Sequence, residues 1–273
     1  GMKSQQNPTD FLRQIKRHFV VESLASAFPC MACAVLPTSN FARPEAKDVP
    51  PAEGSSNLRS YQLFGNQIFL SEGDAMLGPN TGWRTWAGGW LLAKHLEAYL
   101  PQRNGEAPRI LDLSCGTGLA GVALAKAGYE VVLCDLVENV QTIRDNLTRN
   151  RSSKHPCVEK AQVVGYSWGR PLPEELQQVF DLILCGDLLF HVWSGKLQTE
   201  FMQTLQDICR RQRPSPVIIF AGQVRSGRQE SQVIENVAER LGYQQVSIDV
   251  ESSWFSTTSP LVADAKYRLI RLE

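Results

Sequence analysis

One glycine-rich segment has the residue types and spacing of a ligand-binding loop. It begins at Asp112, reads Asp-Leu-Ser-Cys-Gly-Thr-Gly-Leu-Ala-Gly, and contains Gly116, Gly118 and Gly121. Glycine lets a backbone turn tightly and approach a ligand that a Cβ would block. This spacing is typical of dinucleotide-binding loops, so an NAD-dependent oxidoreductase is one hypothesis.

The acid at the start of this loop favours a different ligand. Asp112 would face a pyrophosphate at close range, which repulsion between like charges disfavours. It suits a ligand with an ammonium group, such as S-adenosylmethionine (SAM), which also has a positive sulfonium and no phosphate. Backbone N–H groups from Ser114 to Gly118 could hold the carboxylate of that ligand. Asp135 ends the next expected strand, where it could accept both ribose hydroxyls, a need that NAD and SAM enzymes share.

Three tryptophans lie close to the expected ligand edge. Trp168 follows the third expected strand, where its ring could stack on an adenine. Trp86 precedes a long helix and Trp83 is near it, and the face of either ring could attract a sulfonium. For each of the three, an aromatic residue of the core or its rim is the alternative interpretation.

The elements that must position these residues alternate along the chain from Arg109 onward. Apolar runs predict strands at 109–114, 129–135, 159–166, 180–187, 216–222, 244–250 and 265–272. Amphipathic runs predict helices at 119–127, 137–150, 196–211 and 230–241, with a short helix after Pro173. This order predicts an α/β fold with a doubly wound, Rossmann-like sheet of seven strands. The last two strands have no helix between them, so we expect the last strand to be antiparallel.

The chain before this region divides into two parts. Residues 8–36 indicate a helix with an apolar continuation, and residues 37–57 have the Pro, Ser, Ala and Glu content of a linker. Residues 60–70 predict a β-hairpin around Gly65 and Asn66, and residues 86–100 predict a helix. We therefore expect an N-terminal extension at 1–57 and one domain at 58–273.

Composition narrows the class of protein. The chain has 273 residues, with 28 Lys+Arg against 28 Asp+Glu, and this balance disfavours nucleic acid as the main partner. No apolar run approaches the roughly 20 residues that span a bilayer, so we expect no membrane partner. Seven cysteines in a chain of this length form no disulfide framework, which favours reduced thiols and the cytoplasm or nucleus. Cys30 and Cys33 have redox or zinc spacing, but buried apolar packing is the favoured interpretation, and we expect no metal.

Several segments together resemble one known family. They read GWRTWAGGWLLAKHL, ILDLSCGTGLAGVALAKAGYEVVLCD, NLTRN, YSWG and FDLILCGDLLF. The chain is similar, over about residues 60–270, to the class I lysine methyltransferases of the methyltransferase 16 family. Members of that family have a seven-stranded sheet and use SAM to methylate lysines of folded proteins. The resemblance implies a protein substrate, and we expect a monomer.

The resemblance also implies roles for residues of the cofactor site. Trp86, Gly116, Gly118, Asp135 and Trp168 would line SAM. Asp112 stands at a position that is usually acidic in the family, and Ser167 stands where an acid often precedes the tryptophan.

A second family motif would shape the acceptor site. Asp187 begins the motif Asp-x-x-Tyr, which here reads Asp187-Leu-Leu-Phe190 and so lacks the tyrosine hydroxyl. We expect Asp187 to hold an incoming lysine ammonium and Phe190 to line the channel. His191 is a candidate proton relay, although a solvated loop histidine is the simpler interpretation. A catalytically silent relative that acts as an interaction module remains a third hypothesis beside the methyltransferase and the oxidoreductase.

Overall fold

The computed structural model describes residues 57–73, 81–100, 107–151, 156–212 and 214–273. The predicted helix and linker before residue 57, with Cys30 and Cys33, lie outside the described residues. So the proposed division into 1–57 and 58–273 stays a prediction.

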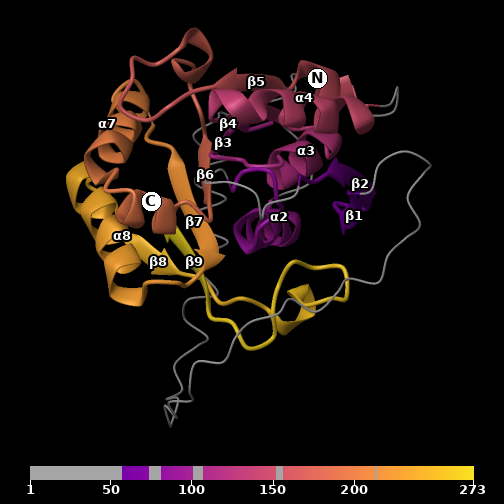
Figure 1. Cartoon of the computed structure of the whole chain (residues 1–273). Coiled ribbons are helices and arrows are strands. Elements are labelled where there is room, and N and C mark those ends of the chain that lie inside the picture. Colours follow the sequence, from indigo (N-terminus) through magenta and orange to yellow (C-terminus); the bar gives the residue numbers. More distant parts are fainter. Residues whose placement is uncertain (1–56, 74–80, 101–106, 152–155, 213) are drawn as a thin grey trace, which may run out of the picture.

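A seven-stranded sheet forms the centre of the fold (Figure 1). Its strands, in spatial order, are β5 (Gln162–Gly165), β4 (Glu130–Asp135), β3 (Arg109–Leu113), β6 (Leu182–Gly186), β7 (Val217–Gln223), β9 (Tyr267–Leu272) and β8 (Gln245–Ser247). The five strands from β5 to β7 are parallel, and β9 is antiparallel to both β7 and β8. The structure thus confirms the predicted α/β fold with an antiparallel last strand.

Helices cover both faces of this sheet, and each face has its own apolar core. One core joins the sheet to α2 (Ala87–Tyr99), α3 (Leu119–Lys126), α4 (Val140–Arg149) and α5 (Pro156–Lys160). The other joins it to α6 (Leu189–Ser194), α7 (Gln198–Cys209) and α8 (Gly227–Leu241). Figure 1 shows α7 and α8 on the side of the sheet opposite α2 and α3. Within the described ranges, we find no helix with the length and apolar character needed to cross a membrane.

A small hairpin packs outside α3 and α4. Strands β1 (Leu58–Leu63) and β2 (Asn66–Ser71) pair antiparallel, so the predicted hairpin is confirmed. Its turn residues are Phe64 and Gly65, both with positive φ, one position earlier than predicted.

Two asparagines, Asn146 in α4 and Asn150 directly after its end, bind the free edge of β2. The side-chain amide of Asn146 accepts from the N–H of Ser71 at 2.7 Å and donates to its carbonyl at 3.2 Å. Asn150, one turn later, bonds the N–H and carbonyl of Phe69 in the same way, at 3.0 and 2.6 Å. Each amide therefore acts as a one-residue substitute for a neighbouring strand, because it supplies the donor and acceptor that the edge lacks.

The element boundaries differ from the sequence prediction most clearly at three places. Residues 189–194 form α6, which was predicted as the loop after the fourth strand. Residues 156–160 are helical, so the strand predicted at 159–166 shrinks to β5. The last large helix begins at Gly227 rather than at Glu230. In each case the short segment lacks a long hydrophobic repeat, and its conformation depends on packing against the sheet.

Candidate active site

A cavity of about 410 Å³ opens at the carboxyl ends of the parallel strands. It lies where the chain order reverses between β3 and β6, the place at which ligands bind in doubly wound sheets. Its volume is within the roughly 300–1,000 Å³ typical of small-molecule sites. Residues of the glycine loop, the end of β4, the segment after β5 and the Asp187–His191 segment all line it.

The glycine loop forms the floor of this cavity. The N–H groups of Ser114 and Cys115 donate to the carbonyl of Cys134, at 2.8 and 3.0 Å, and this ties the loop to β4. Ser114 and Gly116 have positive φ and line the cavity. Gly118 also has positive φ and begins α3, but it lies behind the cavity lining, against Leu133. Its predicted role at the cofactor is therefore a backbone role, in shaping the turn.

Asp112 is buried beneath the loop rather than in the cavity lining. Its carboxylate accepts the N–H of Gly121 in the first turn of α3 at 2.9 Å. The pKa of Asp112 is raised to about 7: burial is the largest cause, the Gly121 hydrogen bond opposes the rise, and the charge of Asp135 adds to it. The predicted contact of Asp112 with a ligand ammonium stays a prediction, and in the structure this acid anchors the loop to α3.

Asp135 points into the cavity with most of its acceptor positions already used. One oxygen accepts the N–H of Gly116 at 2.7 Å. The other accepts the N–H of Leu136 at 2.8 Å and the side-chain amide of Asn139 at 2.6 Å. A carboxylate offers about four acceptor positions, so these three contacts leave about one for a ligand. The expected contact of Asp135 with both ribose hydroxyls stays a prediction. Burial raises the pKa of Asp135, and these three hydrogen bonds oppose the rise.

The side of the cavity beyond Asp135 is largely apolar. Leu136, Tyr166 and Trp168 line it, and Leu136 is exposed. The Trp168 ring packs edge-on against Phe201, with centroids 5.0 Å apart, which fixes its orientation. Trp168 thus combines the two interpretations left open by the sequence, a rim aromatic and a wall of the ligand site. Trp83 lies outside the cavity lining and packs against Gly73.

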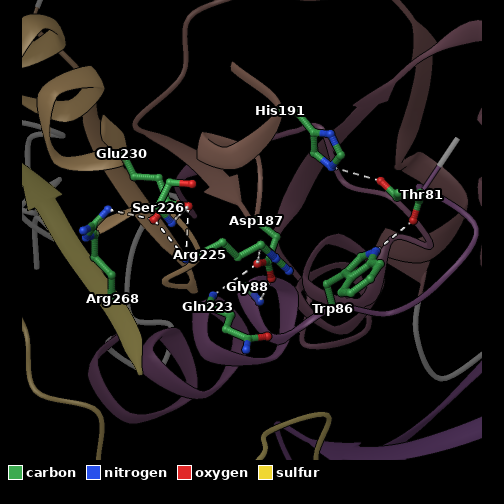
Figure 2. Close-up of polar contacts among 10 residues, drawn as sticks. All are labelled: Thr81, Trp86, Gly88, Asp187, His191, Gln223, Arg225, Ser226, Glu230 and Arg268. Atoms are coloured by element: carbon green, nitrogen blue, oxygen red, sulfur yellow. Dashed lines mark hydrogen bonds and ion pairs between the residues drawn. The ribbon is translucent and has the colours of Figure 1, made fainter. Parts of the chain in front are cut away.

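At the opposite end, Trp86 and His191 meet through one threonine (Figure 2). The indole N–H of Trp86 donates to the carbonyl of Thr81 at 2.8 Å. The hydroxyl of Thr81 lies 3.0 Å from Nε2 of His191. All three residues line the cavity. His191 is at its rim, and desolvation followed by the charge of Arg225 lowers its pKa, so the imidazole is neutral at pH 7.

Asp187 is held by groups from three other parts of the chain. Its backbone has a φ of 51° and its N–H donates to the carbonyl of Ala221 at 2.8 Å. Its carboxylate accepts the N–H of Gly88, the N–H of Gln223 at 3.1 Å and Nη1 of Arg225 at 2.9 Å. The sequence predicted a carboxylate that holds a substrate ammonium. The structure instead pairs its charge within the chain, which favours a positioning role.

Sequence reasoning missed several residues of the cavity. Arg225, Asn139, Leu136 and Leu197 line it without belonging to any motif that the sequence displays. Asn139 had a detectable signal, because it lies four residues after Asp135 at the start of a predicted helix. Arg225 had none, since an arginine between a strand and a helix is common on protein surfaces.

Comparison with known proteins identifies the family. Over residues 72–240 the chain matches the family described as lysine methyltransferase. It belongs to this family. The lysine methyltransferase is 24% identical over 190 residues to protein-lysine methyltransferase METTL21E of Mus musculus, covering 68% of this chain and 72% of that protein. It is 26% identical over 208 residues to protein N-lysine methyltransferase METTL21A of Danio rerio, covering 76% and 89%.

A solved structure shares the fold. The T. thermophilus 16S rRNA N2 G1207 methyltransferase RsmC, in complex with AdoMet and guanosine, aligns with a TM-score of 0.55 at 19% identity. The alignment covers 83% of this chain and 53% of that one.

Family membership confirms the sequence prediction of a methyltransferase that uses SAM, and it sets aside the NAD-dependent oxidoreductase. The described residues fit that cofactor. Gly116 lines the cavity, and a Cβ there would lie 3.3 Å from the carbonyl oxygen of Gly82, so glycine allows these two backbone segments to pack closely. Asp135 retains an acceptor position, and Trp168 offers an oriented ring. In the part of the chain that the structure describes, no group of three or more His, Cys, Asp or Glu side chains could hold a metal ion.

Proposed function

We propose that this lysine methyltransferase transfers the methyl group of SAM to the ε-amino group of a lysine in a protein substrate. One observation carries the proposal: a single cavity joins the glycine loop and Asp135 to the Asp187–Phe190 segment. The relatives METTL21E and METTL21A, both named as protein lysine methyltransferases, support it.

The cofactor would lie along the length of this cavity. Asp135 would accept one ribose hydroxyl and the Trp168 ring would cover the adenine. The N–H groups of Ser114, Cys115, Gly116 and Gly118 already donate within the chain, so the glycine loop would act as the floor beneath the methionine part of the ligand. Asp112 would attract the ligand ammonium from below the loop. When bound there, SAM supplies an electrophilic methyl group on a positively charged sulfur.

The acceptor amine must arrive in its neutral form. A lysine has a reference pKa of about 10.4, so the neutral amine costs roughly 4–5 kcal/mol at pH 7. The amine lone pair forms the new N–C bond as the S–C bond breaks and its electron pair returns to sulfur. Before this step the lysine ammonium loses its proton to water, directly or through His191, and the transfer then gives a methylated lysine, which carries the positive charge, and S-adenosylhomocysteine.

The residues at this end would act mainly by placement, because in-line transfer requires little beyond alignment. Asp187 connects the start of α2 to the ends of β6 and β7 through the N–H groups of Gly88 and Gln223. Phe190 and Trp86 would form the apolar walls that desolvate the amine.

Labelled SAM and a protein extract test the proposal. The wild-type protein should label one or a few protein bands, and mass spectrometry should find the methyl group on lysine. The matched control is Asp135→Ala, which should give little label at the same SAM concentration. A methyl group on arginine, histidine or a small molecule would contradict the lysine assignment. Binding of SAM without label on any band would favour the silent interaction module.

We also propose that residues 58–273 form the catalytic unit, that the protein is a monomer, and that it acts in the cytoplasm or nucleus without nucleic acid. The family match over 72–240 supports the boundary, and four free cysteines in the described residues support a reducing compartment. A chain that starts at Leu58 should keep its affinity for S-adenosylhomocysteine. Loss of that affinity would contradict the boundary.

A further inference from the structure

Arg225 occupies the acceptor end of the cavity. Its guanidinium lies over the Trp86 ring, 5.3 Å from the centroid, and over the Phe190 ring at 5.8 Å. Its Nη1 is 2.9 Å from Oδ1 of Asp187, and its side chain is 25% exposed. Figure 2 shows Arg225 reaching from the α8 side toward Asp187. Two aromatic faces and a carboxylate are the groups that recognise an organic cation, and here a cation of the same chain fills them.

The backbone of Arg225 is anchored as firmly as its side chain. The N–H groups of Arg225 and Ser226 each donate to Oε1 of Glu230 at 3.2 Å. Glu230 is buried, and Arg268 pairs with it at 3.3 Å while also donating to the carbonyl of Gly227 at 3.0 Å. This network places the arginine as a fixed part of the cavity wall (Figure 2).

His191 lies close enough to Arg225 for the charge of the arginine to affect its pKa. After desolvation, the charge of Arg225 is the largest influence on the pKa of His191, and it lowers that pKa. Asp187 and Asp135 raise the pKa of His191, but each by less. At the rim of the cavity the arginine therefore outweighs the carboxylate with which it is paired.

Three other ionisable groups among the described residues also lie near Arg225. Glu230 and Arg268 form an ion pair, so their charges oppose each other. Desolvation raises the pKa of Tyr267 on β9, so its hydroxyl is neutral at pH 7.

We propose that Arg225 is a specificity-determining residue that admits the acceptor as a neutral amine and disfavours an ammonium or a guanidinium. It takes the place between the Trp86 and Phe190 rings that a substrate cation would otherwise occupy, and it neutralises Asp187. A lysine can lose its proton and enter, whereas an arginine stays charged in proteins and is repelled. This inference rests on the proposed transfer to lysine.

The first test measures the effect of Arg225 on the pKa of His191 in the absence of an acceptor. Histidine signals of the protein bound to S-adenosylhomocysteine are titrated by NMR, with His191→Gln to assign the signal. In Arg225→Gln the pKa of His191 should rise, because the positive charge is gone and Asp187 is unpaired. Arg225→Lys should keep it near the wild-type value. Arg225→Met, which keeps the apolar contact with the rings, repeats the test if the glutamine variant does not fold. An unchanged pKa in a folded neutral variant would overturn the proposal.

The second test uses the protein band that the wild-type enzyme labels in an extract. Without Arg225 the amine should hold its proton to higher pH. The rising limb of the pH–rate profile should then move upward, and kcat at pH 7 should fall roughly three- to tenfold. The KM for the acceptor at pH 7 should fall as well, since the ammonium now binds Asp187. Arg225→Lys should restore the profile.

A uniform loss of rate at every pH, with no movement of the profile, would reduce Arg225 to a packing role and overturn the proposal. Failure of the wild-type enzyme to methylate lysine would instead overturn the proposed function. The two failures are distinguishable because the NMR titration needs no acceptor.

Discussion

The two ends of the cavity handle charge in opposite ways. At the cofactor end, Asp112 and Asp135 accept hydrogen bonds from neutral amide donors. At the acceptor end, the carboxylate of Asp187 is paired with Arg225. The first end can therefore attract a cationic ligand, while at the second end the carboxylate of Asp187 is already paired. One cavity thus contains a region suited to the ammonium of SAM and a region suited to a neutral amine.

The two ends also differ in how they are assembled. Ser114, Gly116 and Asp135 of the cofactor end come from one continuous segment, residues 112–135, which holds one loop, one helix and one strand. The acceptor end takes Trp86, Asp187 and Arg225 from three separate segments, and hydrogen bonds to the backbone of α2 and β7 hold them together. A change at the interface between these segments should therefore disturb transfer more than cofactor binding.

The largest effect is expected from Gly88→Ala. A Cβ at Gly88 would overlap the backbone nitrogen of Asp187 and lie 2.7 Å from the carbonyl oxygen of Ala221. Because these are backbone atoms, α2 must move, and a misplacement near 1 Å costs on the order of a hundredfold in rate. Turnover should fall by at least about that factor. Rates with the labelled band from the extract measure the effect.

The matched control is Gly89→Ala in the same helix turn. Its Cβ would lie 3.6 Å from Cβ of Leu119, an ordinary contact. This variant should keep its activity and gain up to about 1 kcal/mol of stability, because alanine is the better helix residue. Equal activity of the two variants would show that the junction of α2 with Asp187 does not govern transfer.

A smaller effect on turnover should follow from Asp187→Ala. The variant loses the contacts to Gly88, Gln223 and Arg225, so the acceptor end loosens while residues 112–135 stay in place. We expect turnover to fall about ten- to a hundredfold, with nearly unchanged affinity for S-adenosylhomocysteine. Single-turnover rates and calorimetry separate the two quantities. A variant that binds poorly but transfers well once loaded would reverse the assignment of the two ends.

Asp135→Ala should weaken ligand binding at the cofactor end and leave the acceptor end unchanged. It removes the acceptor that faces the ligand and releases the N–H of Gly116 and the amide of Asn139. Affinity for S-adenosylhomocysteine should fall about tenfold or more, as expected when a hydrogen bond to a charged acceptor is lost. Calorimetry checks this, and an unchanged dissociation constant would remove Asp135 from the cofactor site.

The smallest expected effect is the contribution of Asp112 to the pH dependence of stability. Its pKa in the folded chain, about 7, is above the value of 3.8 in an unfolded chain. Its contribution to stability is therefore fully present below pH 4 and is lost as pH rises through 7. The amide that replaces the carboxyl group in Asp112→Asn cannot ionise. The melting temperature of this variant should therefore fall less between pH 5 and pH 8 than that of the wild type.

Asp112 should also make the affinity for the ligand depend on pH. If Asp112 attracts the ligand ammonium, S-adenosylhomocysteine should bind the wild type more tightly as pH rises from 6 to 8 and the carboxyl ionises. Asp112→Asn should show a flatter dependence. Parallel curves for the two proteins would limit Asp112 to its contact with Gly121.

Some of the site could be predicted from local sequence. Ser114, Gly116 and Asp135 were found because a strand, a tight turn and a helix in direct succession must place them at one sheet edge. Their backbone conformations depend on neighbours close in the chain, so the spacing of the glycines predicts those conformations. Trp168 was found for the same reason, since it follows the next strand of the sheet.

Other features had no local signal. The helix α6 follows a non-glycine residue with positive φ, Asp187, which is stable there only because three partners hold its carboxylate. The pairing of Asn146 and Asn150 with the edge of β2 joins segments about 80 residues apart. The sequence pattern gives no means of distinguishing either asparagine from a solvent-exposed residue in or next to a helix.

The sequence by itself determined the order of strands and helices, the glycine turn and the family, because these depend on hydrophobic period and short motifs. Only the tertiary structure decided how charge is distributed in the cavity. It placed Arg225 between Trp86 and Phe190 and paired it with Asp187, which changes Asp187 from a ligand for a cation into a support for the acceptor end. The physical reason is that the Coulomb energy depends on distance in space, and residues remote in the chain set that distance.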